Sequence, residues 1–361
     1  MLIPTEPIGS IPRPPELIRA FADRQAGRIS EAEFDRVAQA ALRDTLDRFA
    51  GTGSSVISDG EQTKSSFATY PLEGLTNLDP HGVVIPFADG HTRQLPRLAS
   101  GPFRYGSYAE RYLSRARAMT KLPVKQAVIS VSALSLLYPS SGLADYPREK
   151  FLADLVDEGA ADIRRCLDAG ADSVQIDFTE ARLSLKLDPS GGLLNQFIDL
   201  NNQVLDRYPS TQRSRIGVHT CPGGDQDSTH SADVPYSSLL PSLFRLNAGR
   251  FYIQLASEKN PADVLRLAAE LLQPEQILFV GVTDPISAEI ETAEQVKDRV
   301  LAAASYIPAA QLGTTDDCGF APFLDDTSTS RDIAFSKIRA RVAGTELAAR
   351  ELSRRTGRVA V

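Results

Sequence analysis

The chain predicts an α/β fold of the (β/α)8 TIM-barrel class, on three observations. Short runs rich in β-branched residues alternate with amphipathic helical windows along almost the whole sequence, as is typical of parallel strands joined by helices. Eight such runs can be identified, which is the number that a closed barrel of this type requires. The unusual polar residues follow the ends of these runs, where enzymes with this fold carry their active sites.

The expected elements alternate from the N-terminal region to a long final helix. The expected strands are residues 5–11, 55–60, 124–130, 173–178, 215–220, 250–255, 276–282 and 311–316. The expected helices are residues 15–27, 31–50, 108–120, 148–169, 194–208, 234–246, 261–272, 293–306 and 331–354. Asn260-Pro261 marks the start of one of these helices, because proline is favoured at the first helical position.

The segment 70–106 interrupts this alternation. It is rich in Gly and Pro, and it contains the strand-like patches VVIPFA and TRQLP around Ala88-Asp89-Gly90. Because an Asp-Gly pair between such patches is typical of a tight turn, we expect a β-hairpin insertion after the second strand. The segment does not resemble a linker between independent folding units. Residues 1–361 are therefore interpreted as one domain.

Composition and charge exclude several classes of protein. Hydrophobic residues make up 42% of the chain and charged residues 24%, with a formal net charge of -7 and no prominent run of Lys and Arg, so nucleic acid is not an expected partner. Neither a membrane-spanning run nor a signal-peptide pattern is present, so we expect a cytoplasmic protein with no membrane contact. The three cysteines are too few for a disulfide framework and should be reduced thiols. Assembly into a homo-oligomer is compatible with the sequence.

The stretch 215–224, RIGVHTCPGG, holds a candidate pair of metal ligands. His219 and Cys221 are separated by one residue, so on a strand both side chains would project from the same face. Cys318 follows the last expected strand and would lie at the same end of a barrel. Thiolate sulfur and imidazole nitrogen select zinc over magnesium or calcium, and three ligands leave the open position of a catalytic zinc. The competing interpretation is that all three are ordinary core residues.

Five motifs at the ends of the expected strands carry a family resemblance: Ile8-Gly9-Ser10, Asp59-Gly60-Glu61, Gln175-Ile176-Asp177, His219-Thr220-Cys221 and Asp317-Cys318-Gly319. In order and spacing they resemble the catalytic barrel of cobalamin-independent methionine synthase. The full-length enzymes of that family have two barrels, and this chain resembles the catalytic, C-terminal one alone. The resemblance implies a zinc-dependent methyltransferase in which a zinc-bound thiolate of homocysteine accepts a methyl group from a folate.

The resemblance also implies roles for individual residues. The zinc ligands would be His219, Cys221 and Cys318. The amino-acid end of a small thiol such as homocysteine would be bound by Ile8, Gly9, Ser10, Glu61 and Asp177. Carboxylates suit a substrate ammonium group, and a serine hydroxyl suits a carboxylate. Glu61 and Asp177 would then be catalytic residues, and His230 could add an acid or a contact to the donor, although such a loop is more often only solvated.

Two departures from the family pattern leave alternatives open. Where the family carries a zinc-binding glutamate on the sixth strand, this chain has Gln254, whose amide oxygen is a weaker ligand. Either Gln254 completes the metal shell, or Glu258 does, or the site has three protein ligands, which we favour. The chain contains no Trp, whereas the family stacks its folate on one, so the identity of the donor is open.

Three other functions remain as alternatives at this point. The first is transfer of a different alkyl group to a thiol, as in epoxyalkane:coenzyme M transferases, which share the Asp-Gly-Glu-Gln and His-x-Cys features. The second is a metal-free enzyme of the uroporphyrinogen decarboxylase type, in which the cysteines would be incidental. The third is a barrel that binds a thiol or a metal without catalysis.

Overall fold

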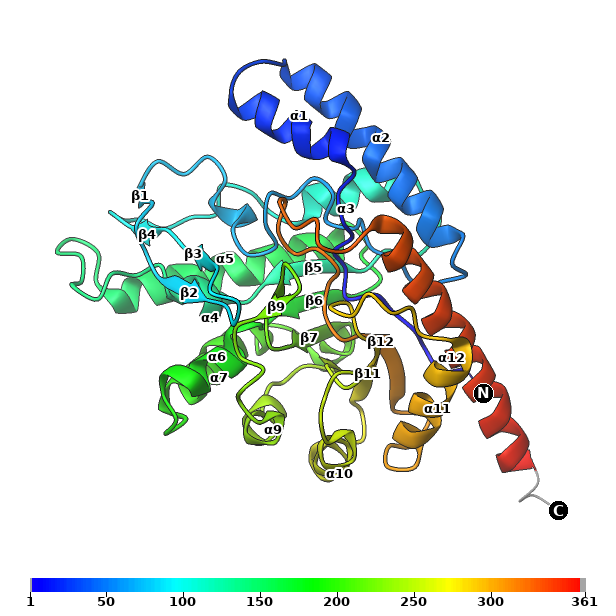
Figure 1. Ribbon diagram of the computed structural model, residues 1–361. Coiled ribbons are helices and arrows are strands. Elements are labelled where there is room, and N and C mark those ends of the chain that lie inside the picture. Colours follow the sequence, from blue (N-terminus) through cyan, green and yellow to red (C-terminus); the bar gives the residue numbers. More distant parts are fainter. Residues whose placement is uncertain (1, 358–361) are drawn as a thin grey trace.

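The centre of the fold is a six-stranded parallel sheet, seen in a computed structural model that describes residues 2–357 (Figure 1). The strands are β5 (Gln126–Ile129), β6 (Val174–Asp177), β7 (Ile216–Thr220), β10 (Arg250–Ile253), β11 (Ile277–Thr283) and β12 (Leu312–Asp316). Their order in space, β12-β11-β10-β7-β6-β5, follows their order in the chain. Because every neighbouring pair is parallel, the carboxyl ends of all six strands lie at the same edge.

Helices fill the connections between the strands and flank the sheet (Figure 1). They are α1 (Pro15–Gln25), α2 (Glu31–Ala50), α3 (Glu110–Arg117), α4 (Val131–Ser135), α5 (Arg148–Asp168), α6 (Glu180–Leu187), α7 (Gly192–Leu205), α8 (Ser210–Arg213), α9 (Tyr236–Leu243), α10 (Pro261–Leu271), α11 (Ala293–Ala304) and α12 (Arg331–Gly357). The predicted start of α10 at Pro261 is confirmed. Three short helices, α4, α6 and α8, lie outside the predicted helical ranges.

Two predicted strands, residues 5–11 and 55–60, do not form strands. Each is an extended segment with one parallel bridge, from Thr5 to Thr314 of β12 and from Ile57 to Val124, which lies shortly before β5. The first segment contains Pro7 and is bounded by further prolines, which have no N–H to donate to a ladder. The second segment ends at Gly60, where the φ angle of +66° turns the chain away from an extended path.

The two extended segments lie at opposite edges of the sheet and also contact each other. The N–H of Ile11 donates to the carbonyl of Gly60 at 3.0 Å. The Ser58 hydroxyl donates to the carbonyl of Gly9 at 2.7 Å. These bonds connect the β12 edge of the sheet to its β5 edge through the N-terminal segment.

The segment 70–106 contains the short helix η1 (Tyr70–Leu72) and two short antiparallel pairs. Strands β1 (Leu78–Asp79) and β4 (Arg97–Leu98) form one pair, and β2 (Val84–Pro86) and β3 (Thr92–Gln94) form the other. The tip between β2 and β3 reaches a further short hairpin, β8 (Gly224–Asp225) with β9 (Ser228–Thr229), where the N–H of Ala88 donates to the carbonyl of Thr229. The segment therefore contacts the loop that follows β7.

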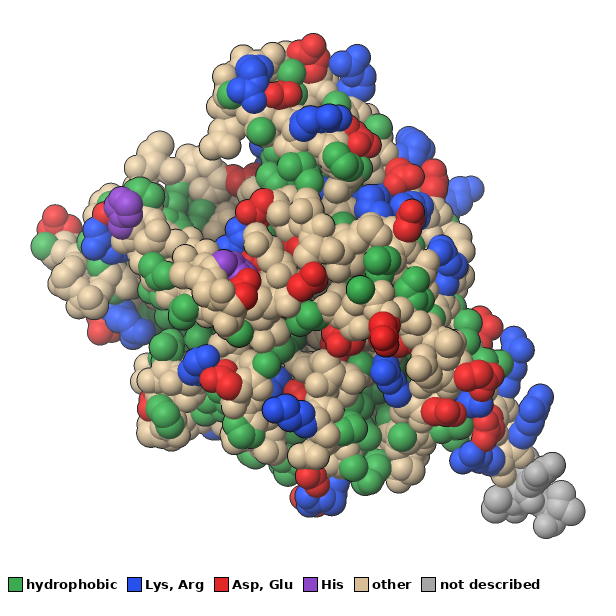
Figure 2. Space-filling view, in the orientation of Figure 1, with side chains coloured by type: hydrophobic (Ala, Val, Ile, Leu, Met, Phe, Trp, Pro, Cys, Tyr) green, Lys and Arg blue, Asp and Glu red, His purple; other side chains and the backbone are tan. Residues whose placement is uncertain are grey.

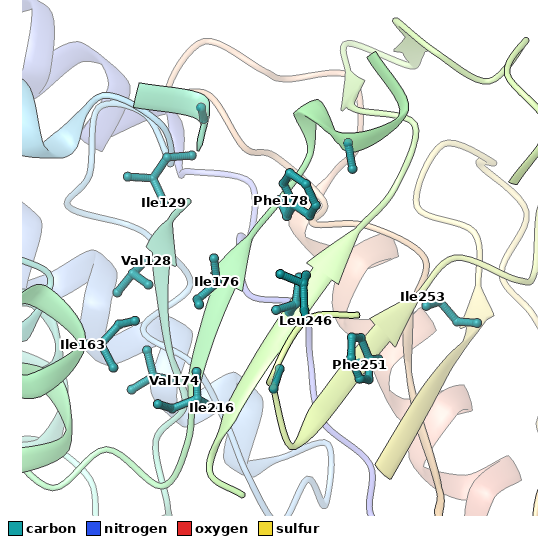
Figure 3. Close-up of a cluster of buried hydrophobic side chains, with 14 of the residues drawn as sticks. Val128, Ile129, Ile163, Val174, Ile176, Phe178, Ile216, Leu246, Phe251 and Ile253 are labelled. Atoms are coloured by element: carbon teal, nitrogen blue, oxygen red, sulfur yellow. The ribbon is translucent and has the colours of Figure 1, made fainter. Parts of the chain in front are cut away.

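Side chains alternate between the two faces of the sheet. The apolar set packs against the helices, in a cluster that Figure 3 shows with Val128, Val174, Ile176, Ile216, Phe251 and Ile253. Strand register pairs Ile176 with Val218 on this face, and Asp177 with His219 on the other. Because successive strand residues point to opposite faces, the polar side chains gather on the face turned away from this cluster.

The exterior carries charges of both signs. Figure 2 shows Lys and Arg interspersed with Asp and Glu over the face in view, without a broad area of one sign. Within residues 2–357, no helix has both the length and the apolar character needed to cross a bilayer.

Candidate metal centre and substrate cavity

The three predicted metal ligands come together at the carboxyl edge of the sheet. His219 is on β7, Cys221 directly follows that strand, and Cys318 lies just beyond β12. The ligand atoms of the three side chains all lie within 4.8 Å of one another. The two sulfurs are 3.1 Å apart and both cysteines are free thiols. The fold therefore assembles a compact group from positions almost 100 residues apart, Cys221 and Cys318 being separated by 97.

The protonation of this group suits a metal. Nδ1 of His219 lies 3.3 Å from the carbonyl oxygen of Tyr252, while Nε2 is buried with no hydrogen-bond partner in the described part of the chain. With its proton on Nδ1, the imidazole presents a lone pair on Nε2, and a backbone carbonyl behind the ring is the usual support for a ligating histidine. A buried nitrogen without a partner is costly unless something binds it. Together with two thiols, it is a donor set that fits zinc.

Hydrogen bonding makes the two thiols unequal. The hydrogen bond with Cys318, followed by bonds from the backbone N–H groups of Gly223 and Gly224, lowers the pKa of Cys221. The hydrogen bond with Cys221, together with burial, raises the pKa of Cys318 well above its usual value. Cys221 is therefore the more acidic of the two thiols, and a bound cation would favour loss of a proton from either one.

Gln254 and Glu258, the two candidates for a fourth ligand, both contact Arg182 of α6. The guanidinium donates to Oε1 of Gln254 at 3.2 Å and to Oε1 of Glu258 at 2.9 Å. Nε2 of Gln254 donates to the Ser257 hydroxyl at 2.8 Å. Both oxygens therefore face a fixed positive charge, which is unfavourable surroundings for a second cation.

Asp317, next to Cys318, organises the loop after β10. Its two carboxylate oxygens accept hydrogen bonds from the backbone N–H groups of Leu255, Ala256 and Ser257 at 2.8–2.9 Å, and from the Ser257 hydroxyl at 2.6 Å. Burial raises the pKa of Asp317 to about 6, and these hydrogen bonds act in the opposite direction. One carboxylate thus joins the β10 loop to Cys318, which carries one of the candidate metal-ligating thiols.

A cavity of about 380 Å³ opens next to the three candidate ligands. His219 and Cys318 line it, and so do most of the residues predicted to bind substrate. These are Ile8, Ser10, Glu61 and Asp177, whereas Gly9 does not line the cavity. His230, predicted to act as an acid or to contact the donor, lines the cavity as well. A molecule in the cavity can therefore reach both the candidate metal ligands and the carboxylates.

The carboxylates in the cavity are held by buried partners. Nζ of Lys64 donates to Oε1 of Glu61 at 3.2 Å, and both side chains are buried. Nε2 of Gln175 donates to Oδ1 of Asp177 at 2.7 Å and to the carbonyl of Ile8 at 3.1 Å. Burial raises the pKa of Asp177 to about 6. These contacts fix both carboxylates in place before a substrate arrives.

Arg13 connects the loop that carries Glu61 with the loop that follows Cys318. Its guanidinium donates to the carbonyls of Glu61 at 2.8 Å, Lys64 at 2.9 Å and Ala321 at 2.8 Å. Glu61 has a φ angle of +54°, an uncommon conformation for a residue other than glycine. The position of Glu61 therefore depends on the contacts that surround it.

His230 faces the cavity in its neutral form. Nδ1 lies 2.6 Å from the Ser231 hydroxyl, and burial lowers the pKa of the imidazole to about 4. A Cβ atom on Gly223 would lie 1.7 Å from Nε2, so the absence of a side chain at position 223 makes room for this ring. At neutral pH almost all of the His230 imidazole is therefore uncharged. It can form hydrogen bonds, but it is a poor general acid.

The β2–β3 hairpin contributes the outer wall of the cavity through Ile85, Phe87 and Arg93. Nε of Arg93 donates to Asp225 of β8 at 2.5 Å, and Nε2 of His91 lies 3.1 Å from the same carboxylate. The Arg93–Asp225 ion pair and the His91 contact thus hold the hairpin against the loop that follows Cys221.

Three residues of the site carried no clear signal in the sequence: Lys64, Glu180 and Arg182. The partners of Lys64 and Asp317 could not be inferred, because each contact depends on how distant strand ends meet. Arg182 and Glu180 belong to α6, a helix that the hydrophobic periodicity does not indicate. Asp317 lies in the motif Asp317-Cys318-Gly319, but the sequence did not indicate its supporting role.

Comparison with known proteins identifies similar sequences over nearly the whole chain. Residues 3–334 match the family model described as "Cobalamin-independent synthase, Catalytic domain". A protein of Trichodesmium erythraeum named 5-methyltetrahydropteroyltriglutamate--homocysteine methyltransferase is 24% identical over 320 residues, which cover 88% of this chain and 40% of that protein. The chain thus spans about two-fifths of that relative. A methionine synthase of Sulfurisphaera tokodaii is 22% identical over 352 residues, covering 97% of this chain and 94% of that protein.

Solved structures show the same fold. A B12-independent methionine synthase from Shewanella sp. W3-18-1, in complex with selenomethionine, superposes with a TM-score of 0.77. It is 21% identical in sequence, and the match covers 98% of this chain and 99% of that one. A putative vitamin-B12 independent methionine synthase from Listeria monocytogenes has a TM-score of 0.71 at 22% identity, covering 96% of this chain and 98% of that one.

Proposed function

Because this chain belongs to the family of cobalamin-independent synthase catalytic domains, we propose that it is a zinc-dependent methyltransferase acting on a small thiol such as homocysteine. One observation carries the proposal. Cys318 and His219, whose Nε2 has no hydrogen-bond partner among the described residues, line a cavity that Glu61 and Asp177 also line, and Cys221 lies directly beside them. The family match favours this reaction over the coenzyme M transferase and uroporphyrinogen decarboxylase alternatives.

In this proposal His219, Cys221 and Cys318 hold the metal. Zinc, when bound, would lower the pKa of a thiol placed on it, so that the sulfur is a nucleophilic thiolate at neutral pH. Glu61 and Asp177 bind the substrate ammonium group, and the Ser10 hydroxyl binds its carboxylate.

The remaining side chains position the substrate and the donor. Lys64 and Gln175 hold the two carboxylates in fixed orientations, which limits the reorganisation needed on binding. His230, neutral at pH 7, gives a hydrogen bond to the donor and does not serve as its general acid. Exclusion of water falls to the β2–β3 hairpin, which lines the cavity with Ile85 and Phe87.

We also propose that the six-stranded sheet is part of a closed (β/α)8 barrel. The extended segments 5–11 and 55–60 take the places of the remaining two barrel strands, and the Ile11–Gly60 hydrogen bond joins them. Residues 1–361 then form one domain, with 70–106 as a hairpin insertion over the carboxyl end of the barrel. This architecture accounts for the meeting of His219 with Cys318 from strands far apart in the chain.

Titration with homocysteine tests the proposed chemistry directly. Zinc-loaded protein in weak buffer near pH 7 is expected to release about one proton per chain on binding homocysteine, because the bound thiol ionises. Metal-free protein is the control and should release almost none. Equal release from both forms, or none from the zinc-loaded form, would overturn the proposal. The first donor to assay is 5-methyltetrahydropteroyltriglutamate, for which the relative from Trichodesmium erythraeum is named.

Changing Gln254 to Glu tests whether three protein residues hold the zinc. We expect zinc affinity to change by less than ~3-fold, because the new carboxylate would pair with Arg182 instead of the metal. Combining this change with Arg182→Gln removes the competing charge, and affinity should then rise by ~10-fold or more. Competition with a chromogenic chelator measures both variants. A tenfold rise in Gln254→Glu alone would identify position 254 as a ligand.

A further inference from the structure

Glu180 lines the same cavity and carries an unused hydrogen-bonding atom. It is the first residue of α6 and only 5% exposed. Oε1 accepts a hydrogen bond from the Ser130 hydroxyl at 2.6 Å and another from the Ser132 hydroxyl. Oε2 is buried and has no hydrogen-bond partner among the described residues. A buried carboxylate oxygen in this state is costly unless a ligand supplies the missing donor.

The hydroxyl network around Glu180 is directional. Nδ2 of Asn201 donates to the Ser132 oxygen at 2.7 Å, which leaves the Ser132 hydroxyl proton for Glu180. Ser130 is the N-cap of α4 and accepts from the N–H of Ala133, so its own proton is also available to Glu180. Both serines therefore present donors to Oε1 and stabilise a carboxylate. These hydrogen bonds hold the Glu180 side chain in one orientation and leave Oε2 free to accept a hydrogen bond from a ligand.

The surroundings of Glu180 are apolar and lack a compensating cation. Nearby parts of the cavity wall come from β5, α4 and α6, with Ile129, Ala133, Leu134 and Leu183. Among the described residues that line the cavity, Arg93 is the one Lys or Arg, and it is paired with Asp225. Burial raises the pKa of Glu180 to about 7, and Asp177 adds to this rise. A positive or N–H group brought by a ligand would stabilise the ionised form.

Glu180 is distinct from the carboxylates assigned to the thiol substrate. Asp177 accepts a hydrogen bond from Gln175, on the face of β6 turned away from the apolar cluster. Glu180 instead accepts hydrogen bonds from Ser130 and Ser132, at the connection between β5 and α4. The cavity therefore offers two acidic positions with separate supports. The first suits the ammonium group of an amino-acid thiol, and the second is available to another molecule.

We propose that Glu180 selects the methyl donor, through a hydrogen bond from a nitrogen of the donor to Oε2. The donor class is then a molecule with a protonated or N–H-bearing nitrogen joined to an apolar body, which lies against Ile129, Leu134 and Leu183. This assignment rests on the proposed methyltransferase function. It deepens that function by identifying a residue that discriminates between donors.

Binding of two matched probes to the zinc-loaded protein tests the assignment. Benzylamine carries a nitrogen cation on an apolar ring, and benzyl alcohol is its neutral counterpart. Calorimetry or ligand-observed NMR should show benzylamine binding ~10-fold or more tightly than benzyl alcohol, because a charge-assisted hydrogen bond adds to the same apolar contact. Equal affinities in the unmodified protein would overturn the assignment without any variant.

Two carboxylate-to-amide variants then locate the preference. Glu180→Gln should reduce the preference for benzylamine over benzyl alcohol to within ~2-fold, since the amide removes the negative charge while preserving the shape of the side chain. Asp177→Asn is the matched control, which should keep the benzylamine preference and weaken homocysteine binding. A preference that survives Glu180→Gln, or that disappears in Asp177→Asn instead, would contradict the assignment. Glu180→Asp, which withdraws the carboxylate by one methylene, provides a second variant with the charge retained and should also lower the preference.

Proton release on homocysteine binding separates this inference from the proposed function. Glu180→Gln should keep that release, which also shows that the variant is folded around an intact thiol site. Absence of release in the unmodified protein would count against the methyltransferase proposal itself. Retained release with an unchanged probe preference would count against Glu180 alone.

Discussion

Changing Cys221 to Ser is expected to abolish stable zinc binding and methyl transfer to homocysteine. Structural zinc in zinc-finger peptides binds with about 10–16 kcal/mol shared among its ligands, so loss of one of three protein ligands here should lower affinity by at least ~100-fold. The alcohol of serine ionises far less readily than a thiol and is a poor replacement. We expect zinc content, measured by elemental analysis after dialysis, to fall from about one per chain to below ~0.1.

Cys166→Ser is the matched control for this experiment. Cys166 is buried in α5 and is not part of the group formed by His219, Cys221 and Cys318, so no ligand role is expected for it. Its replacement can lower stability, but the zinc content of the folded protein should remain unchanged. Equal zinc content in Cys221→Ser and the unmodified protein would show that this sulfur does not hold the metal.

Much of the fold was predictable because buried parallel strands leave a simple signal. The run at 215–220 contains Ile216 and Val218 and is followed by polar residues, and β7 forms there. The N-terminal segment was harder, because its isoleucines suggest a strand while Pro4 and Pro7 prevent a full ladder. The outcome there depends on contacts with β12 and with residues 58–60, which local sequence does not encode.

The candidate metal ligands were predictable for a different reason. Soft ligands are rare in this chain, so His219, Cys221 and Cys318 stand out at the ends of expected strands. Residues that position other side chains through ion pairs or hydrogen bonds do not stand out, because arginine and aspartate are common throughout the sequence. Arg182 reaches Gln254 across 72 positions of the chain, and only the packed structure reveals that contact.

Gln254 illustrates the limit of reasoning from one residue at a time. Taken alone, the change from Glu to Gln reads as a weakened zinc ligand. With Arg182 at 3.2 Å, the neutral amide is instead the residue that can face a guanidinium while Glu258 supplies the compensating charge at 2.9 Å. The glutamine at position 254 is therefore understood together with Arg182 and Glu258, with which it forms one hydrogen-bonded group.

Changing Asp317 to Asn is expected to lower zinc affinity by ~10–100-fold, which is the usual cost of losing support for a metal ligand. The carboxylate accepts four hydrogen bonds from residues 255–257, whereas an amide has one acceptor oxygen and would turn its NH2 group towards N–H donors. The loop after β10 should then move away, and Cys318, the next residue, should lose its fixed position.

Chelator competition and thermal unfolding, measured together, separate support of the metal site from general stability. Ser257→Ala removes one of the four hydrogen bonds and leaves the backbone contacts, so we expect an affinity loss below ~3-fold. An Asp317→Asn protein with the zinc affinity of the unmodified protein would show that Cys318 is held without this carboxylate. A graded loss from Ser257→Ala to Asp317→Asn would instead mean that the metal site depends on a hydrogen-bonded carboxylate that binds no metal.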